Sequence, residues 1–91
     1  MGDLQMIDLR SDTLTLPTEE MREIIANATV GDDCYGEDMS VNELEQYCKQ
    51  IFGVEDALFV PTGPMANQLA IKTQVSEGNE VIIETNYHIN F

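Results

Sequence analysis

Two short apolar runs with a helix-forming segment between them most constrain how this chain can fold. ALFV occupies residues 57–60 and VII occupies residues 81–83, and both runs have the length and continuous hydrophobicity of buried parallel strands. Residues 65–75 have helical composition, and Pro64 suits the first position of a helix. We therefore predict a βαβ unit with a right-handed crossover, and the α/β fold class.

The turn between the first run and the predicted helix reads FVPTGPMA, residues 59–66. A helix that begins there directs its unpaired N–H groups and the positive end of its dipole at one point, an arrangement that suits a phosphate. The turn indicates an anion or cofactor site, although single-glycine turns of this kind also serve purely structural purposes. It lacks the glycine pattern and the lysine of a P-loop or a dinucleotide fingerprint, which disfavours a nucleotide-binding domain.

The N-terminal part is predicted to be an extended arm, residues 1–17, because residues 7–16 alternate apolar and polar and Pro17 ends the alternation. Thr18 is expected to cap a helix over residues 19–28. The acidic segment 30–38 has no periodicity and reads as an exposed loop.

A second helix is expected to start at Ser40, which forms a capping box with Glu43, and to end at Gly53. These helices are too few to cover both faces of a parallel sheet. We therefore interpret residues 18–91 as an incomplete domain, the opening part of a larger α/β fold.

Composition restricts the classes of partner. The 91 residues carry a formal net charge of -13, so nucleic acid and anionic membranes are not expected to bind. No apolar stretch has the length of a membrane span and the first residues do not resemble a secretory signal, so a cytoplasmic location is expected. Cys34 and Cys48 lack metal-ligand spacing, and we expect reduced thiols and no metal site.

Three motifs carry a family resemblance: RSDT at residues 10–13, GDDCYGED at residues 31–38 and TGPMAN at residues 62–67. In this order and at this approximate spacing, they resemble the N-terminal portion of the low-specificity L-threonine aldolases. That family consists of pyridoxal-phosphate enzymes of the aspartate-aminotransferase fold and is close to the β-eliminating lyases. The resemblance implies the opening part of a fold-type I large domain and covers residues 7–89.

The resemblance also implies an activity: cleavage of the Cα–Cβ bond of L-threonine or a related β-hydroxy-α-amino acid to glycine and an aldehyde, with pyridoxal 5'-phosphate as the electron sink. By the same resemblance, Ser11 and Tyr35 bind the amino-acid substrate. His88 matches a histidine that stacks on the pyridine ring and can take part in proton transfer. From the residues alone, each of the three could instead be an ordinary exposed side chain.

The family's phosphate site is matched by Thr62, Gly63, Pro64 and Met65. Proline stands where the family has threonine, and it supplies neither an amide donor nor a hydroxyl. The hydroxyl of Thr62 and the amides of Gly63 and Met65 are expected to remain for the phosphate.

Neither lysine of the chain, Lys49 or Lys72, matches the lysine that holds the cofactor as a Schiff base in this family. We therefore expect the 91 residues alone to be inactive. The resemblance implies that the partner is a second copy in a homo-oligomer or a complementary C-terminal polypeptide. The alternative is a truncated, non-catalytic remnant or a small acidic interaction module.

Overall fold

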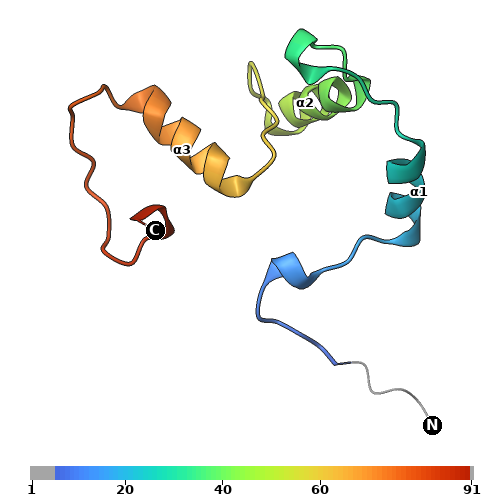
Figure 1. The fold of residues 1–91 in the computed structure, drawn as a ribbon, viewed down its shortest axis with the longest axis horizontal. Coiled ribbons are helices and arrows are strands. Elements are labelled where there is room, and N and C mark those ends of the chain that lie inside the picture. Colours follow the sequence, from blue (N-terminus) through green and yellow to red (C-terminus); the bar gives the residue numbers. More distant parts are fainter. Residues whose placement is uncertain (1–5, 91) are drawn as a thin grey trace. The chain divides into compact units, whose positions relative to one another are not determined.

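A computed structural model describes residues 6–90 (Figure 1). The described elements are three α-helices and three short 3-10 turns. In chain order they are η1 (Asp12–Leu14), α1 (Glu19–Asn27), η2 (Asp33–Tyr35), α2 (Met39–Phe52), α3 (Gly63–Gln74) and η3 (His88–Asn90). Their contacts divide the chain into two units, with the division between Ser40 and Val41, and each unit is described by itself.

The predicted βαβ unit is wrong, and with it the α/β class and the opening part of a fold-type I large domain. Within residues 6–90 there is no strand, and the segments 57–60 and 81–83 make no ladder hydrogen bonds with each other. The Phe59 N–H donates instead to the Glu45 carboxylate of α2, at 2.8 Å. Short parallel strands need paired neighbours and covered faces. Here Ile82 is fully exposed, so the described chain is helical with extended connections.

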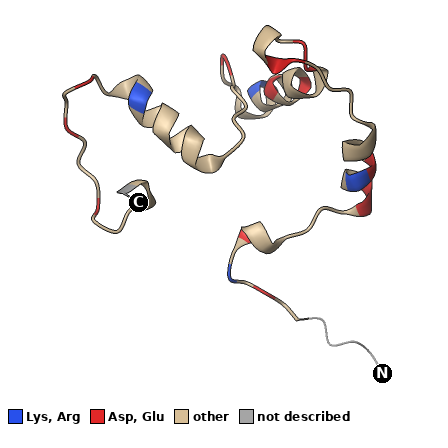
Figure 2. Ribbon diagram, in the orientation of Figure 1, with Lys and Arg blue, Asp and Glu red and all other residues tan. Residues whose placement is uncertain are grey.

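Helix α1 forms where it is predicted, one residue shorter at its C-terminal end. The Thr18 hydroxyl accepts a hydrogen bond from the Met21 N–H at 3.2 Å, which satisfies one of the unpaired donors of the first turn. Glu19 and Glu20 follow in that turn, where negative charge is favoured by the helix dipole, and Figure 2 shows the acidic start of this helix.

Helix α2 begins at Met39, one residue before the predicted cap. Ser40 therefore lies in the first turn, and its hydroxyl donates to the Thr29 carbonyl at 2.7 Å. The other end is as predicted: Gly53 follows Phe52 with φ 62°, the left-handed conformation that ends a helix with least strain in glycine.

Helix α3 begins at Gly63, one residue before Pro64, which was predicted as its first residue, and Thr62 is its cap. The segment η3 contacts α3, so both belong to one unit. No helix among the described residues combines the length and the hydrophobicity needed to cross a bilayer.

The described side chains form no buried core; all are exposed or half-buried. Of the predicted arm, residues 1–5 lie outside the described part. Residues 6–9 have no regular structure. The extended segment predicted over residues 7–16 is interrupted at Ser11, which caps the short turn η1. The division of the chain into an arm over 1–17 and a domain over 18–91 remains a prediction.

Candidate cofactor-binding site

The turn that opens α3 has the geometry of a capped helix N-terminus. Thr62 has extended backbone angles, φ -141° and ψ 149°, and its hydroxyl oxygen accepts from the Met65 N–H at 3.2 Å. Its carbonyl accepts from the Ala66 N–H, also at 3.2 Å. The Gly63 N–H has no hydrogen-bond partner among the described residues, and a Cβ built on Gly63 would meet nothing within 4 Å. The turn therefore faces open space with one amide unpaired.

Two donors remain for an anion at this turn. The Thr62 oxygen accepts the Met65 amide and still carries its own proton, which can be donated to a phosphate oxygen. The second donor is the Gly63 amide, and the dipole of α3 favours negative charge at the same point. Pro64 contributes no donor. The Met65 amide, expected from the sequence to be available, is already bonded to Thr62.

His88 is the first residue of η3 and its side chain is exposed. A turn precedes it, in which the Tyr87 N–H donates to the Glu84 carbonyl at 3.0 Å. Because η3 contacts α3, the structure brings the element that carries His88 to the helix that carries the phosphate turn. The stacking and proton-transfer roles of His88 remain predictions.

Ser11 lies in the N-terminal unit as the cap of η1. Its hydroxyl oxygen accepts from the Thr13 N–H at 3.2 Å and lies 2.8 Å from the Thr13 hydroxyl oxygen. Just before it, the Arg10 guanidinium binds both carboxylate oxygens of Asp8, with Nε at 2.9 and 3.1 Å. This pair holds the pKa of Asp8 below its ordinary value and raises that of Arg10.

Tyr35 ends the turn η2 in the same N-terminal unit, and 79% of its surface is exposed. The side chain is therefore available to a ligand. The substrate-binding roles predicted for Ser11 and Tyr35 are untested by this geometry.

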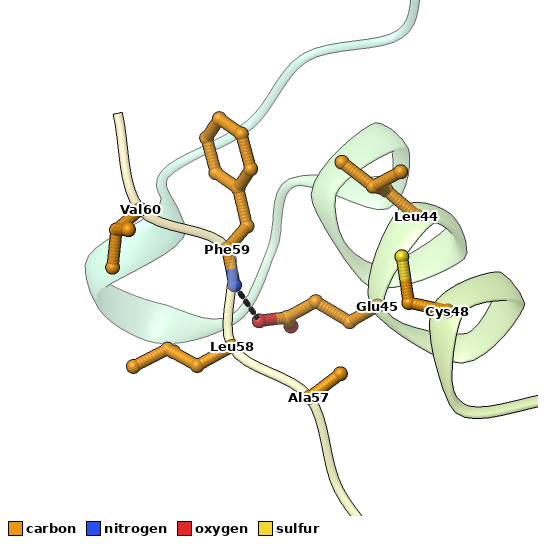
Figure 3. A pocket seen from close by; sticks show the side chains of 7 residues that line it. All are labelled: Leu44, Glu45, Cys48, Ala57, Leu58, Phe59 and Val60. Carbon is orange, nitrogen blue, oxygen red and sulfur yellow. Dashed lines mark hydrogen bonds between the residues drawn. The ribbon is translucent and has the colours of Figure 1, made fainter. Parts of the chain in front are cut away.

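An apolar hollow of about 250 Å³ between α2 and the segment 57–60 was not predicted from the sequence (Figure 3). It is lined by Leu44, Glu45, Cys48, Ala57, Leu58, Phe59 and Val60. The sequence carried part of the signal, since Leu44 and Cys48 share the apolar stripe of α2. The bond between Glu45 and the Phe59 amide, which holds the segment beside the helix, has no such signature.

Neither lysine of the chain lies at the turn that opens α3. Lys72 lies in the last turn of α3, at the end opposite the phosphate turn. The Lys49 side chain is half-buried, and its Nζ lies 3.7 Å from the Asp56 carboxylate. Both cysteine thiols are free, and the described residues contain no group of three or more side chains suited to a metal ion.

Comparison with known proteins defines the class. The family model for beta-eliminating lyases matches residues 8–91. This match covers nearly the whole sequence, so the chain belongs to the beta-eliminating lyase family.

Three individual relatives show which proteins this chain is similar to. A low specificity L-threonine aldolase of Escherichia coli K12 is 47% identical over 78 residues, 86% of this chain and 23% of the relative. A probable low-specificity L-threonine aldolase of Arabidopsis thaliana is 44% identical over 88 residues, 96% of this chain and 25% of the relative. An uncharacterized protein of Caenorhabditis elegans is 52% identical over 84 residues, 92% of this chain and 20% of the relative.

The resemblance to the low-specificity L-threonine aldolases predicted from the three motifs is thus confirmed. The chain spans about a fifth to a quarter of the length of these relatives.

Proposed function

We propose that this chain is the phosphate-binding portion of a pyridoxal-phosphate-dependent lyase that cleaves L-threonine or a related β-hydroxy-α-amino acid to glycine and an aldehyde. Membership of the beta-eliminating lyase family and the similarity to low-specificity L-threonine aldolases support the reaction. The observation that carries the proposal is the turn at Thr62 and Gly63, where a hydroxyl proton and an unpaired amide meet the start of α3.

The reaction requires the Cα–Cβ bond to break while the β-hydroxyl loses its proton to become the aldehyde and Cα gains a proton to become glycine. Pyridoxal 5'-phosphate supplies the electron sink that makes the carbon–carbon cleavage feasible. In this proposal Thr62 and Gly63 hold the phosphate ester. Ser11 and Tyr35 bind the amino acid, and His88 stacks on the ring and moves a proton near neutral pH.

The remaining requirement is a lysine that holds the cofactor covalently, which neither Lys49 nor Lys72 is placed to supply. We therefore propose that the lysine comes from a complementary C-terminal polypeptide. Assembly as a homo-oligomer is proposed separately, from the family resemblance. On this proposal the 91 residues alone bind the phosphate ester without turnover.

The test uses pyridoxine 5'-phosphate, which lacks the aldehyde and so cannot be trapped by surface lysines. Its aromatic ring proton NMR resonance is followed as the chain is added, and the same proton of pyridoxine, the ligand without phosphate, is followed in a parallel titration. Thr62→Val removes the hydroxyl donor and is expected to weaken binding about tenfold or more. Thr62→Ser keeps the hydroxyl and is expected to bind as the unsubstituted chain does.

Thr73→Val is the matched control, because the Thr73 hydroxyl donates to the Ala70 carbonyl near the other end of the same helix, at 3.1 Å. Circular dichroism of each variant shows whether α3 is retained. Equal affinity for pyridoxine and its phosphate, or equal losses in Thr62→Val and Thr73→Val, would contradict the proposal.

A further inference from the structure

The loop between α1 and α2 is closed by hydrogen bonds to itself. The Asp32 carboxylate accepts from the Cys34 N–H at 3.0 Å. The carbonyl of the same residue accepts from the amides of Tyr35 and Glu37, at 3.1 and 3.0 Å. Asp32 thus accepts hydrogen bonds from amides before and after Tyr35, and the Tyr35 side chain remains exposed.

The two ends of the loop are held together as well. The Gly31 N–H donates to the Asp38 carboxylate at 3.1 Å. A Cβ at Gly31 would lie only 2.2 Å from the Glu37 carbonyl oxygen, closer than any side chain permits. The two backbones therefore approach each other at a distance that only glycine allows.

We infer that Asp32 and Gly31 are positioning residues, which fix the backbone of this loop so that the Tyr35 side chain is held outward before any ligand arrives. A long loop rich in charge and glycine would otherwise sample many conformations, and a contact residue on it would lose that freedom on binding. Fixing the loop in advance removes that cost. The inference rests on the proposed function only in naming the amino-acid substrate as what Tyr35 contacts.

The first measurement is amide hydrogen exchange by NMR on the 91-residue chain. Asp32→Ala removes the acceptor for Cys34, and exchange at Cys34, Tyr35 and Glu37 is expected to rise about five- to tenfold. Asp32→Asn keeps an acceptor oxygen without the charge and is expected to restore protection. Helical content by circular dichroism is expected to stay unchanged, which separates loop order from loss of α1 or α2.

Asp33→Ala is the matched control. It is the same substitution one residue later, and the Asp33 carboxylate accepts no hydrogen bond from the described residues. Gly31→Ala is the second variant, since it breaks the loop by steric conflict without removing a charge. Equal exchange in Asp32→Ala and Asp33→Ala, or full protection in Gly31→Ala, would overturn the inference.

The second measurement separates the loop from the proposed function. L-threonine is titrated in the presence of pyridoxine 5'-phosphate while the Tyr35 ring resonances are followed. L-threonine is expected to shift the Tyr35 ring resonances in the unsubstituted chain. A shift that is smaller in Asp32→Ala and restored in Asp32→Asn supports both the substrate contact of Tyr35 and the positioning role of Asp32. Equal shifts of the Tyr35 resonances in the unsubstituted chain and in both variants overturn the positioning role of Asp32. Absence of movement in the unsubstituted chain contradicts the substrate contact, and amide exchange still decides whether Asp32 orders the loop.

Discussion

At the scale of single residues, Pro64 most directly limits the proposed phosphate site. It stands where the resemblance implies a threonine, which could donate both an amide and a hydroxyl, whereas proline donates neither. We predict that Pro64→Thr raises the affinity for pyridoxine 5'-phosphate by about tenfold or more, because a donor to a charged oxygen is regained. Isothermal titration measures the change. Pro61→Thr, just before the capping residue, is the control, and an equal gain there would point to general loosening of the turn.

Asp8 and Arg10 give a prediction for pH dependence. The Arg10 guanidinium holds the pKa of Asp8 below its ordinary value of 3.8. Since the folded-state pKa is lowered, the pair is present above that value and is lost as the pH falls through the lower, folded-state pKa. Carboxyl carbon chemical shifts of Asp8 follow the titration. Arg10→Gln is expected to raise the midpoint, whereas Arg22→Gln, in α1, is expected to leave it unchanged.

At the scale of elements, the link between α2 and the segment 57–60 depends on one side chain. Glu45 accepts the Phe59 amide at 2.8 Å beside the apolar hollow. Glu45→Ala is expected to increase hydrogen exchange at Phe59 roughly tenfold, because the amide loses its only acceptor among the described residues. Glu43→Ala lies on the same helix and makes no such bond, so similar exchange in both variants would show that the link contributes nothing.

The elements also show what the sequence could and could not predict. Helix ends follow from residues a few positions apart, so the roles of Thr18 and Gly53 were predicted correctly. The start of α2 was misplaced by one residue because Ser40 bonds to Thr29, which no local capping rule anticipates. The strands were wrong for a different reason: an apolar run indicates where a strand could form, but a strand exists only when a distant segment pairs with it.

The candidate site divides in the same way. The residues of the phosphate turn are neighbours in sequence, and their geometry follows from the cap of α3. The element η3, which begins at His88, contacts α3, and no periodicity of the sequence predicts that contact. Ser11 and Tyr35 lie in the N-terminal unit, and their substrate-binding roles remain predictions from the resemblance.

At the scale of the whole molecule, the balance between apolar exposure and charge determines stability. Many large apolar side chains are exposed, among them Leu9 at 90% and Ile82 at 101%, and the net charge of -13 opposes compaction. With no buried described residue to make unfolding cooperative, we predict a broad, shallow thermal transition by circular dichroism and calorimetry. A sharp two-state transition of the monomer would contradict this prediction.

The Thr62 hydroxyl accepts the Met65 amide and is proposed to donate its own proton to phosphate. These two roles restrict different sets of residues at position 62. A mutant library selected only for an intact α3 should return Asp and Asn beside Thr and Ser, because all four cap helices well. Selection for retention of the B6 ester should discard Asp, whose negative charge repels phosphate. It should retain Thr and Ser, whose oxygen takes up an amide while its proton is offered to the anion. The difference between the two surviving sets would separate a folding requirement from a binding requirement at a single codon.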